Sequence, residues 1–157
     1  MIHQSQRLFC YGVSAMQLRR IAMLAWLVLL LPAALACSLT KPEPFDLFLN
    51  RFRADANFAT ARVNYPLKYE TWAYGADNDG KDESSVTVSW LQRKEIESWP
   101  PLDNYLQENK LDAEIVRRTR HARVVRVSQA NSDWLLLYHF SIAHGCWRLN
   151  KIENQSL

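Results

Sequence analysis

The chain has 157 residues, a formal net charge of +3, 4 glycines and 3 cysteines. So few glycines argue against a phosphate-cradling loop, and so few cysteines exclude a disulfide-rich scaffold. The residues after Cys37 carry equal numbers of acidic and basic side chains, because the excess positive charge lies before that position. The global charge therefore gives no support for nucleic-acid binding, and we expect no nucleic-acid partner.

The N-terminal segment carries the strongest signal in the sequence. Two arginines precede an apolar run over residues 21–31, and small residues precede Cys37. A basic start, an apolar centre and a small-residue exit predict a secretory signal peptide over residues 1–36. The compact basic head after Met16 favours this methionine as the true start of translation, which would leave residues 1–15 out of the protein. The run is shorter than the roughly 20 residues of a transmembrane helix. We therefore expect the protein to act outside the cytoplasm.

Two products of leader cleavage remain open. Ala34-Leu35-Ala36-Cys37 resembles a lipobox, which predicts acylation of Cys37, and Ser38 is typical of sorting to the outer membrane. The product would be a lipoprotein that faces the periplasm and contacts the membrane through its lipid anchor. Alternatively, cleavage after Ala36 leaves a soluble periplasmic protein, in which an oxidising compartment permits a disulfide between Cys37 and Cys146.

Residues 37–43 are expected to form the lipidated cysteine and a short tether, and residues 44–157 a single domain. A first helix begins near Pro44, because its apolar residues recur on one face: Phe45, Phe48, Leu49 and Phe52. A second short helix is predicted over residues 55–61, with Asp55 as its N-cap.

The rest of the domain has mainly strand patterns. Alternating and β-branched residues predict antiparallel strands over residues 68–74, 84–92, 113–129, 134–142 and 147–153. A short helix over residues 94–99 and a helical or irregular connection over residues 102–110 separate the second strand from the third. Helices first and an antiparallel sheet afterwards predict an α+β fold.

Two groups of residues carry a family resemblance. The opening group is Phe45, Phe48, Phe52, Asp55, Phe58, Arg62-Val63 and Tyr65-Pro66-Leu67. The closing group is Tyr138, Phe140, Gly145, Trp147, Leu149, Lys151-Ile152 and Ser156. Together they resemble an uncharacterised bacterial lipoprotein family, domain-of-unknown-function family 4348. The resemblance implies a nuclear-transport-factor-like or cystatin-like cone, in which N-terminal helices pack on a curved antiparallel sheet. It implies no activity and no functional residues.

A cone of this kind often has a pocket at its mouth, and we expect three aromatic residues to line it: Trp72, Trp90 and Tyr138. Enzymes on such a fold need a general base in the pocket. Asp46 lies beside the apolar helix face, Asp55 has a capping role, and His139 alternates out of phase with its neighbours on the buried strand face. No pair shows an acid–base arrangement. We therefore predict a non-catalytic binding module without a cofactor or metal, and keep as an alternative an isomerase or dehydratase acting on a small apolar substrate.

Five arginines form the remaining polar feature: Arg117, Arg118, Arg120, Arg123 and Arg126. On one strand, Arg118, Arg120 and Arg126 would share a face and the other two the opposite face. Such crowding favours either pairing with acids, such as Glu70, Glu95 or Glu114, or a surface for an acidic envelope partner or anionic head groups. A periplasmic immunity or inhibitor protein, acting against a toxin or hydrolase, is a further alternative for a small exported protein of this kind.

Overall fold

The structure is a computed structural model that describes residue 37, residues 41–76 and residues 82–156. The chain divides into two units, Met1–Ala36 and Cys37–Leu157, and only the second is described. The predicted signal peptide and part of the predicted tether therefore lie outside the described residues. Across the described ranges, we find no helix with the length and apolarity that a bilayer-spanning segment needs.

Two helices open the described unit and confirm the predicted pattern. Helix α2 (Phe45–Ala54) buries four apolar residues on one face, namely Phe45, Phe48, Leu49 and Phe52. Helix α3 (Ala56–Ala61) follows after Asp55, whose Oδ1 accepts a hydrogen bond of 3.0 Å from the Phe58 amide. This N-cap satisfies one of the amide groups that a helix start leaves without an internal partner.

Six strands form one sheet in the order β2-β1-β6-β5-β4-β3. Their bounds are β1 Val63–Ala76, β2 Asp82–Leu91, β3 Asp112–Arg118, β4 Ala122–Ser128, β5 Leu135–Ala143 and β6 Cys146–Asn154. All neighbouring pairs are antiparallel except β1 and β6, which run parallel. The sheet is therefore mixed, not antiparallel as predicted, because the β3–β6 meander returns its last strand beside β1 in the same direction.

The predicted strand over residues 113–129 is wrong, since the segment folds as the β3–β4 hairpin. The turn closes through hydrogen bonds from the Thr119 amide to the Ala122 carbonyl oxygen (2.9 Å) and from the Ala122 amide to Thr119 Oγ1 (3.0 Å). The hydroxyl of Thr119 thus supports a turn that contains no glycine, proline or asparagine. The hairpin distributes the five arginines over two strands and the turn between them.

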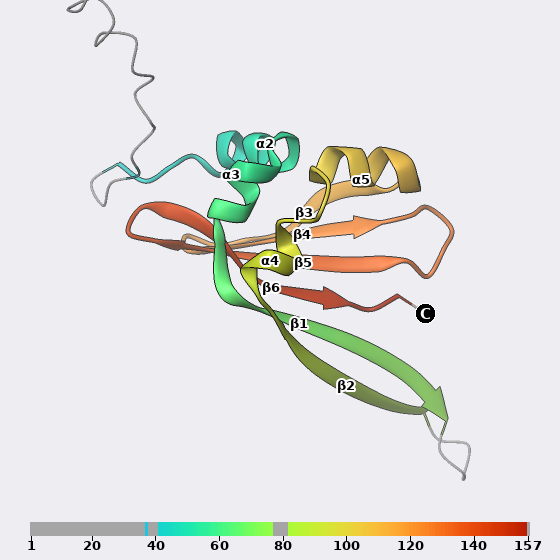
Figure 1. The fold of residues 1–157 in the computed structure, drawn as a ribbon. Coiled ribbons are helices and arrows are strands. Elements are labelled where there is room, and N and C mark those ends of the chain that lie inside the picture. The colour runs from blue at the N-terminus through green and yellow to red at the C-terminus, as the bar shows by residue number, and fades with distance from the viewer. Residues whose placement is uncertain (1–36, 38–40, 77–81, 157) are drawn as a thin grey trace, which may run out of the picture. The chain divides into compact units, whose positions relative to one another are not determined.

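Helices and sheet form two layers, with α2, α3 and α5 (Leu102–Asn109) on one face of the sheet (Figure 1). The core lies between them, where Phe48 and Phe140 are nearly inaccessible and their ring centroids lie 5.5 Å apart in an edge-to-face contact. Between β2 and α5 the chain forms the short helix α4 (Arg93–Ile96). The β1–β2 pair extends beyond the helical layer (Figure 1), and none of the helices that the structure describes lies over this part of the sheet. The architecture confirms the α+β prediction.

Candidate functional site

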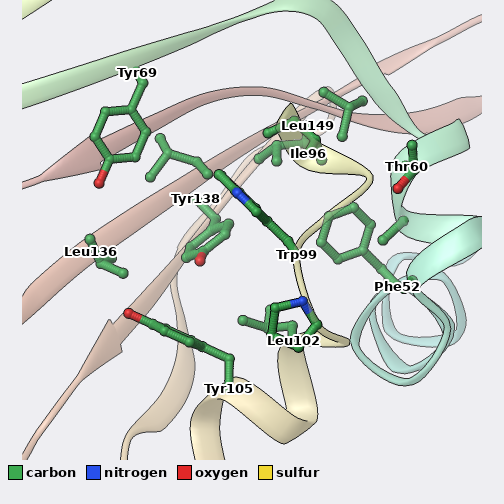
Figure 2. A pocket seen from close by; sticks show the side chains of 15 residues that line it. Phe52, Thr60, Tyr69, Ile96, Trp99, Leu102, Tyr105, Leu136, Tyr138 and Leu149 are labelled. Atoms are coloured by element: carbon green, nitrogen blue, oxygen red, sulfur yellow. The ribbon is translucent and has the colours of Figure 1, made fainter. Parts of the chain in front are cut away.

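A cavity of about 260 Å³ lies between the helical layer and the sheet. Its walls are apolar and come from α2, α3, the segment from α4 to α5, and strands β1, β5 and β6; they include Phe52, Val63, Ile96, Trp99, Leu102 and Ile152. Figure 2 shows Trp99 in the middle of the lining residues, with Phe52 and Thr60 to its right. The segment from α4 to α5 forms one wall of the cavity, since Ile96, Trp99, Leu102 and Tyr105 all line it.

Three tyrosines supply most of the polar atoms of the cavity. Tyr69, Tyr105 and Tyr138 come from β1, α5 and β5, and their rings lie on the same side of the cavity (Figure 2). Burial raises the pKa of Tyr138, and the nearby hydroxyls of Tyr105 and Tyr69 raise it further. Burial also raises the pKa of Tyr105, and Tyr69 acts in the same direction, while a hydrogen bond with the Trp134 side chain acts in the opposite direction. These two phenols are therefore protonated at neutral pH and can both donate and accept hydrogen bonds.

The candidate general bases lie elsewhere. Asp46 is exposed on α2, Asp55 caps α3, and His139 faces the opposite side of the sheet from Tyr138, as predicted. Among the described residues that line the cavity, none is a carboxylate or an imidazole. The apolar and tyrosyl side chains that line the cavity are suited to hydrogen bonding and apolar contact. An isomerase, in contrast, needs a base that changes its protonation state near neutral pH.

Of the three predicted lining residues, the structure brings only Tyr138 to the cavity. Trp72 and Trp90 lie on the outer face of the β1–β2 pair, where Trp90 is 57% exposed. Their positions follow from the alternation of side chains along β1. Leu67 and Tyr69 face the core, so Lys68 and Trp72 face outward, and Trp90 lies opposite Lys68 on the same face.

The segment after β2 contributes to the cavity, which the sequence did not predict. Trp99, Leu102 and Tyr105 all line the cavity, whereas Trp99 was expected only in a short helix and the other two in a helical or irregular connection. Two signals point to this role: Pro101 immediately before the helix is a typical start residue, and Leu102, Tyr105 and Leu106 recur with helical spacing.

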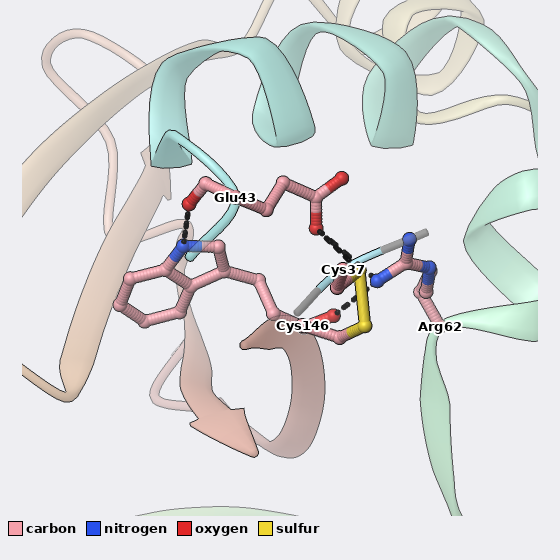
Figure 3. Close-up of a disulfide and its surroundings, with 5 residues drawn as sticks. Cys37, Glu43, Arg62 and Cys146 are labelled. Carbon is pink, nitrogen blue, oxygen red and sulfur yellow. Dashed lines mark hydrogen bonds and ion pairs between the residues drawn. A yellow bond between two sulfur atoms is a disulfide. The ribbon is translucent and has the colours of Figure 1, made fainter. Parts of the chain in front are cut away.

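A disulfide joins Cys37 to Cys146, with the two Cα atoms 5.0 Å apart (Figure 3). Around it, Glu43 forms an ion pair of 3.1 Å with Arg62, and its carbonyl oxygen accepts a 2.9 Å hydrogen bond from the Trp147 indole nitrogen. A thioether-linked acyl chain would occupy the same sulfur as the disulfide. In this structure Cys37 therefore forms the disulfide that the sequence left open as an alternative, and acylation of Cys37 stays a prediction.

The five arginines do not form one continuous surface. Arg126 pairs with Glu114 across the β3–β4 hairpin, one of the acids expected as a partner. Arg123 points to the core side and lies 5.6 and 5.1 Å from the ring centroids of Phe45 and Trp147. In the part of the chain that the structure describes, no ion pair involves Arg117, Arg118 or Arg120. The latter two are exposed near the β3–β4 turn.

A second polar group lies on the outer face of the sheet; we call it the outer charge cluster. It consists of Lys68, Glu70, His139, Lys151 and Glu153. Glu70 is only 8% exposed and lies 2.6 Å from Lys68 Nζ and 3.1 Å from Lys151 Nζ, while Lys151 also pairs with Glu153. Hydrogen bonding from Lys68 lowers the pKa of Glu70 despite its burial. Two lysines and two glutamates balance each other, so the cluster is neutral when His139 is neutral.

The acidic, histidine and cysteine side chains of the described residues do not indicate a metal site. Within residues 37, 41–76 and 82–156, no three His, Cys, Asp or Glu side chains gather in a way that could hold a metal ion.

Comparison with known proteins identifies the fold but not a family. No protein-family model matches the chain, and no curated protein matches it. An NTF2-like protein from Bacteroides fragilis NCTC 9343 aligns with a TM-score of 0.52 and 19% identity, over 74% of this chain and 48% of that one. A cystatin-like protein from Bacteroides caccae ATCC 43185 aligns with a TM-score of 0.47 and 19% identity, over 74% and 78%.

This chain thus spans about half the length of the first of these structures. At such low identity the similarity shows the fold alone. The resemblance to domain-of-unknown-function family 4348 stays a prediction, whereas the predicted cone is confirmed: the chain has the NTF2-like α+β fold.

Proposed function

We propose that this chain is an exported, non-catalytic binding module that holds a small apolar molecule in the cavity. The observation that carries the proposal is the composition of that cavity, which combines apolar walls with tyrosyl hydroxyls and has no carboxylate or imidazole among its described lining residues. An engineered apolar cavity of about 150 Å³ binds benzene. A cavity of about 260 Å³ therefore accommodates one ring with several further atoms.

The polar atoms of the cavity favour a neutral ligand with one hydrogen-bonding group. Tyr105 and Tyr138 are protonated at neutral pH because burial raises their pKa. A ligand hydroxyl or carbonyl can pair with these phenols, whereas an ionised ligand would lose its hydration without gaining a counter-charge from the described lining residues. The ligand class is therefore a neutral, mainly apolar molecule with one polar end.

Two probes of the same shape test this proposal. p-Cresol and toluene differ by one hydroxyl, so the difference in their dissociation constants measures the contribution of the tyrosines. We expect calorimetry to show that both bind and that p-cresol binds more tightly. In the Tyr138→Phe variant the preference for p-cresol should shrink, because one hydroxyl is lost from the cavity.

A cavity-filling variant supplies the control. Ala59 lines the cavity, so Ala59→Leu should abolish binding of both probes. Leu47→Ala on the exposed side of α2 should leave binding unchanged, since Leu47 is 63% exposed. Absence of binding to the wild-type protein, or equal binding to the Ala59→Leu variant, would refute the cavity as the ligand site.

The location of the protein is part of the proposal. The predicted leader supports export, and pairing of Cys37 with Cys146 supports the soluble periplasmic alternative, because disulfides persist in oxidising compartments. Mass spectrometry of the peptide that contains Cys37 distinguishes the alternatives. A disulfide-linked peptide supports our proposal, whereas a diacylglycerol adduct supports the outer-membrane lipoprotein and membership of family 4348.

One observation favours the immunity or inhibitor alternative, namely the exposure of Arg118 and Arg120 without ion pairs in the described residues. Two exposed cations beside the turn of the β3–β4 hairpin can attract an acidic partner. The double variant Arg118→Glu/Arg120→Glu should then lose a protein that cross-links to the wild type in periplasmic extracts, while Lys41→Glu at another exposed position should retain it. Equal cross-linking by both variants would exclude this surface.

A further inference from the structure

Strand β2 forms one edge of the sheet, so one of its two sides has no neighbouring strand among the described residues. Residues 84–90 are all exposed, including Val86 (42%), Val88 (44%) and Trp90 (57%). These three residues share the outer face of the strand, because their partners in β1 are Trp72, Glu70 and Lys68.

This edge lacks the features that keep sheet edges apart. Proteins protect exposed edges with charged residues, prolines or β-bulges. Residues 84–91 read Ser-Ser-Val-Thr-Val-Ser-Trp-Leu, with no charge and no proline. The register between β1 and β2 is also continuous over ten residue pairs, so no bulge twists the edge away. An edge of this kind is suited to pairing with another strand.

From these observations we propose that β2 pairs with β2 of a second copy of this chain, in antiparallel orientation about a two-fold axis at Val88. A symmetric interface places every residue of the edge opposite a residue of the same edge. A charged edge would therefore meet like charges near the axis, which is destabilising. The charge-free centre of β2 removes this obstacle.

The ends of β2 favour this antiparallel pairing. The first two residues of β2, at positions 82 and 83, are acidic in the sequence, and the helix α4 that follows β2 begins with Arg93 and Lys94. Pairing centred on Val88 brings the acidic start of β2 in one copy next to the basic start of α4 in the other, twice by symmetry.

The same register aligns the apolar residues of the outer face. Val88 lies opposite its own copy, and Val86 of each chain lies opposite Trp90 of the other. Aromatic and β-branched residues form favourable cross-strand pairs. The pairing also satisfies main-chain amide and carbonyl groups that face solvent at a sheet edge.

Cysteine cross-linking tests the register directly in the full chain. Directly opposed residues have Cβ atoms about 4.5–5.5 Å apart, so Val88→Cys should form a covalent dimer on mild oxidation. Val86→Cys is the matched control, because its copy lies four residues along the strand, about 13 Å away. Both variants and the wild type share the three native cysteines, so any background cross-linking is common to all. Cross-linking of Val88→Cys no faster than that of Val86→Cys would overturn the proposal.

Charge variants test the interface without a covalent bond. Val88→Lys should be monomeric in sedimentation velocity, because two lysines then face each other across the axis. Val88→Glu should also be monomeric, and mixing the two variants should restore a dimer through opposite charges. Val88 is 44% exposed, so both variants should keep the wild-type circular dichroism spectrum. A monomeric wild type, or a dimer that persists in Val88→Lys, would contradict the assignment.

Discussion

Arg62 Nη1 lies 3.1 Å from Glu43 Oε2, and both side chains are largely buried beside the Cys37–Cys146 disulfide. The guanidinium also lies 3.4 Å from the Trp147 carbonyl oxygen, which it contacts as a donor, and the Glu43 amide donates to the Gly145 carbonyl oxygen. Cys37 and Glu43 are thereby fixed to the β5–β6 hairpin and the start of β1 by covalent, ionic and main-chain contacts. These two residues form part of the folded unit.

Removal of the disulfide should destabilise the protein. The two cysteines are 109 positions apart in the sequence, and a bridge that closes about 100 residues restricts the unfolded chain by about 4–5 kcal/mol. We expect Cys146→Ser to lower the free energy of unfolding by an amount of this order, measured by urea denaturation. Ala143→Ser, at the exposed position of β5 that lies opposite Cys146, is the control and should leave the stability nearly unchanged. Equal stability of Cys146→Ser and the wild type would show that the bridge does not form.

Truncation of Phe48 should have a comparable effect. Phe48 is 1% exposed and contacts the rings of Phe45, Phe52, Phe58 and Phe140. Replacing a buried phenylalanine by alanine removes these contacts and leaves a cavity, which costs about 3–5 kcal/mol. Leu47→Ala in the same helix should change the stability by less than about 0.5 kcal/mol, since Leu47 is 63% exposed. Similar melting temperatures for the two variants would contradict the assigned core.

The outer charge cluster predicts a loss of stability in mild acid. Burial lowers the pKa of His139; Lys151 and Arg117 act in the same direction, while Glu153 and Glu70 oppose it. The unfolded chain therefore binds the His139 proton at a higher pH than the folded protein does. Stability is fully present above the unfolded pKa of about 6.5 and is lost as the pH falls towards the lower folded pKa.

Urea denaturation at a series of pH values measures this linkage. We expect the free energy of unfolding to decrease between about pH 7 and about pH 5. The decrease should be smaller in His139→Gln, whereas His121→Gln, at an exposed position of the β3–β4 turn, should follow the wild type. A pH dependence that is identical in His139→Gln and the wild type would show that the cluster does not control it.

The buried Tyr138 predicts a second loss of stability, at alkaline pH. Tyr138 has a raised pKa because it is buried, so the unfolded chain loses this proton first, at about pH 10. Stability should therefore decrease as the pH rises above about 10. The decrease should be weaker in Tyr138→Phe but unchanged in Tyr74→Phe, because Tyr74 is 50% exposed. Alkaline denaturation, followed by the absorbance of tyrosinate, measures the decrease in the wild type and in the two variants.

Local patterns predicted those parts of the fold that depend on neighbours in the sequence. The helical spacing from Phe45 to Phe52 and the cap at Asp55 both follow from a few consecutive residues. The alternation around His139 likewise placed this side chain on the outer face. Each of these features is decided by the periodicity of the local backbone.

Other features of the fold were not predicted, in part because they depend on contacts between residues that lie far apart in the sequence. The parallel contact of β1 with β6 joins residues more than 80 positions apart, such as Tyr69 and Ile152. The turn at Thr119 lacks the usual turn residues, so the arginine-rich segment had the pattern of one long strand. Trp72 and Trp90 were expected in the pocket because they are aromatic, although the alternation of β1 already places Tyr69 inside and Trp72 outside.

The cavity was only partly predictable for the same reason. Its wall forms where the segment containing Trp99, Leu102 and Tyr105 crosses the sheet, and the position of that segment depends on packing against residues far away in the sequence. Tyr138 was found because it belongs to the strand with the most regular apolar alternation.

Native mass spectrometry of the protein, isolated from the cell envelope without organic solvent, shows whether the cavity holds a small apolar molecule. We expect a wild-type mass above that of the disulfide-bonded polypeptide, by the mass of one neutral compound that solvent extraction releases, and no such addition in Ala59→Leu. A wild-type protein with no added mass, or an addition retained by Ala59→Leu, would show that the cavity is not a ligand site.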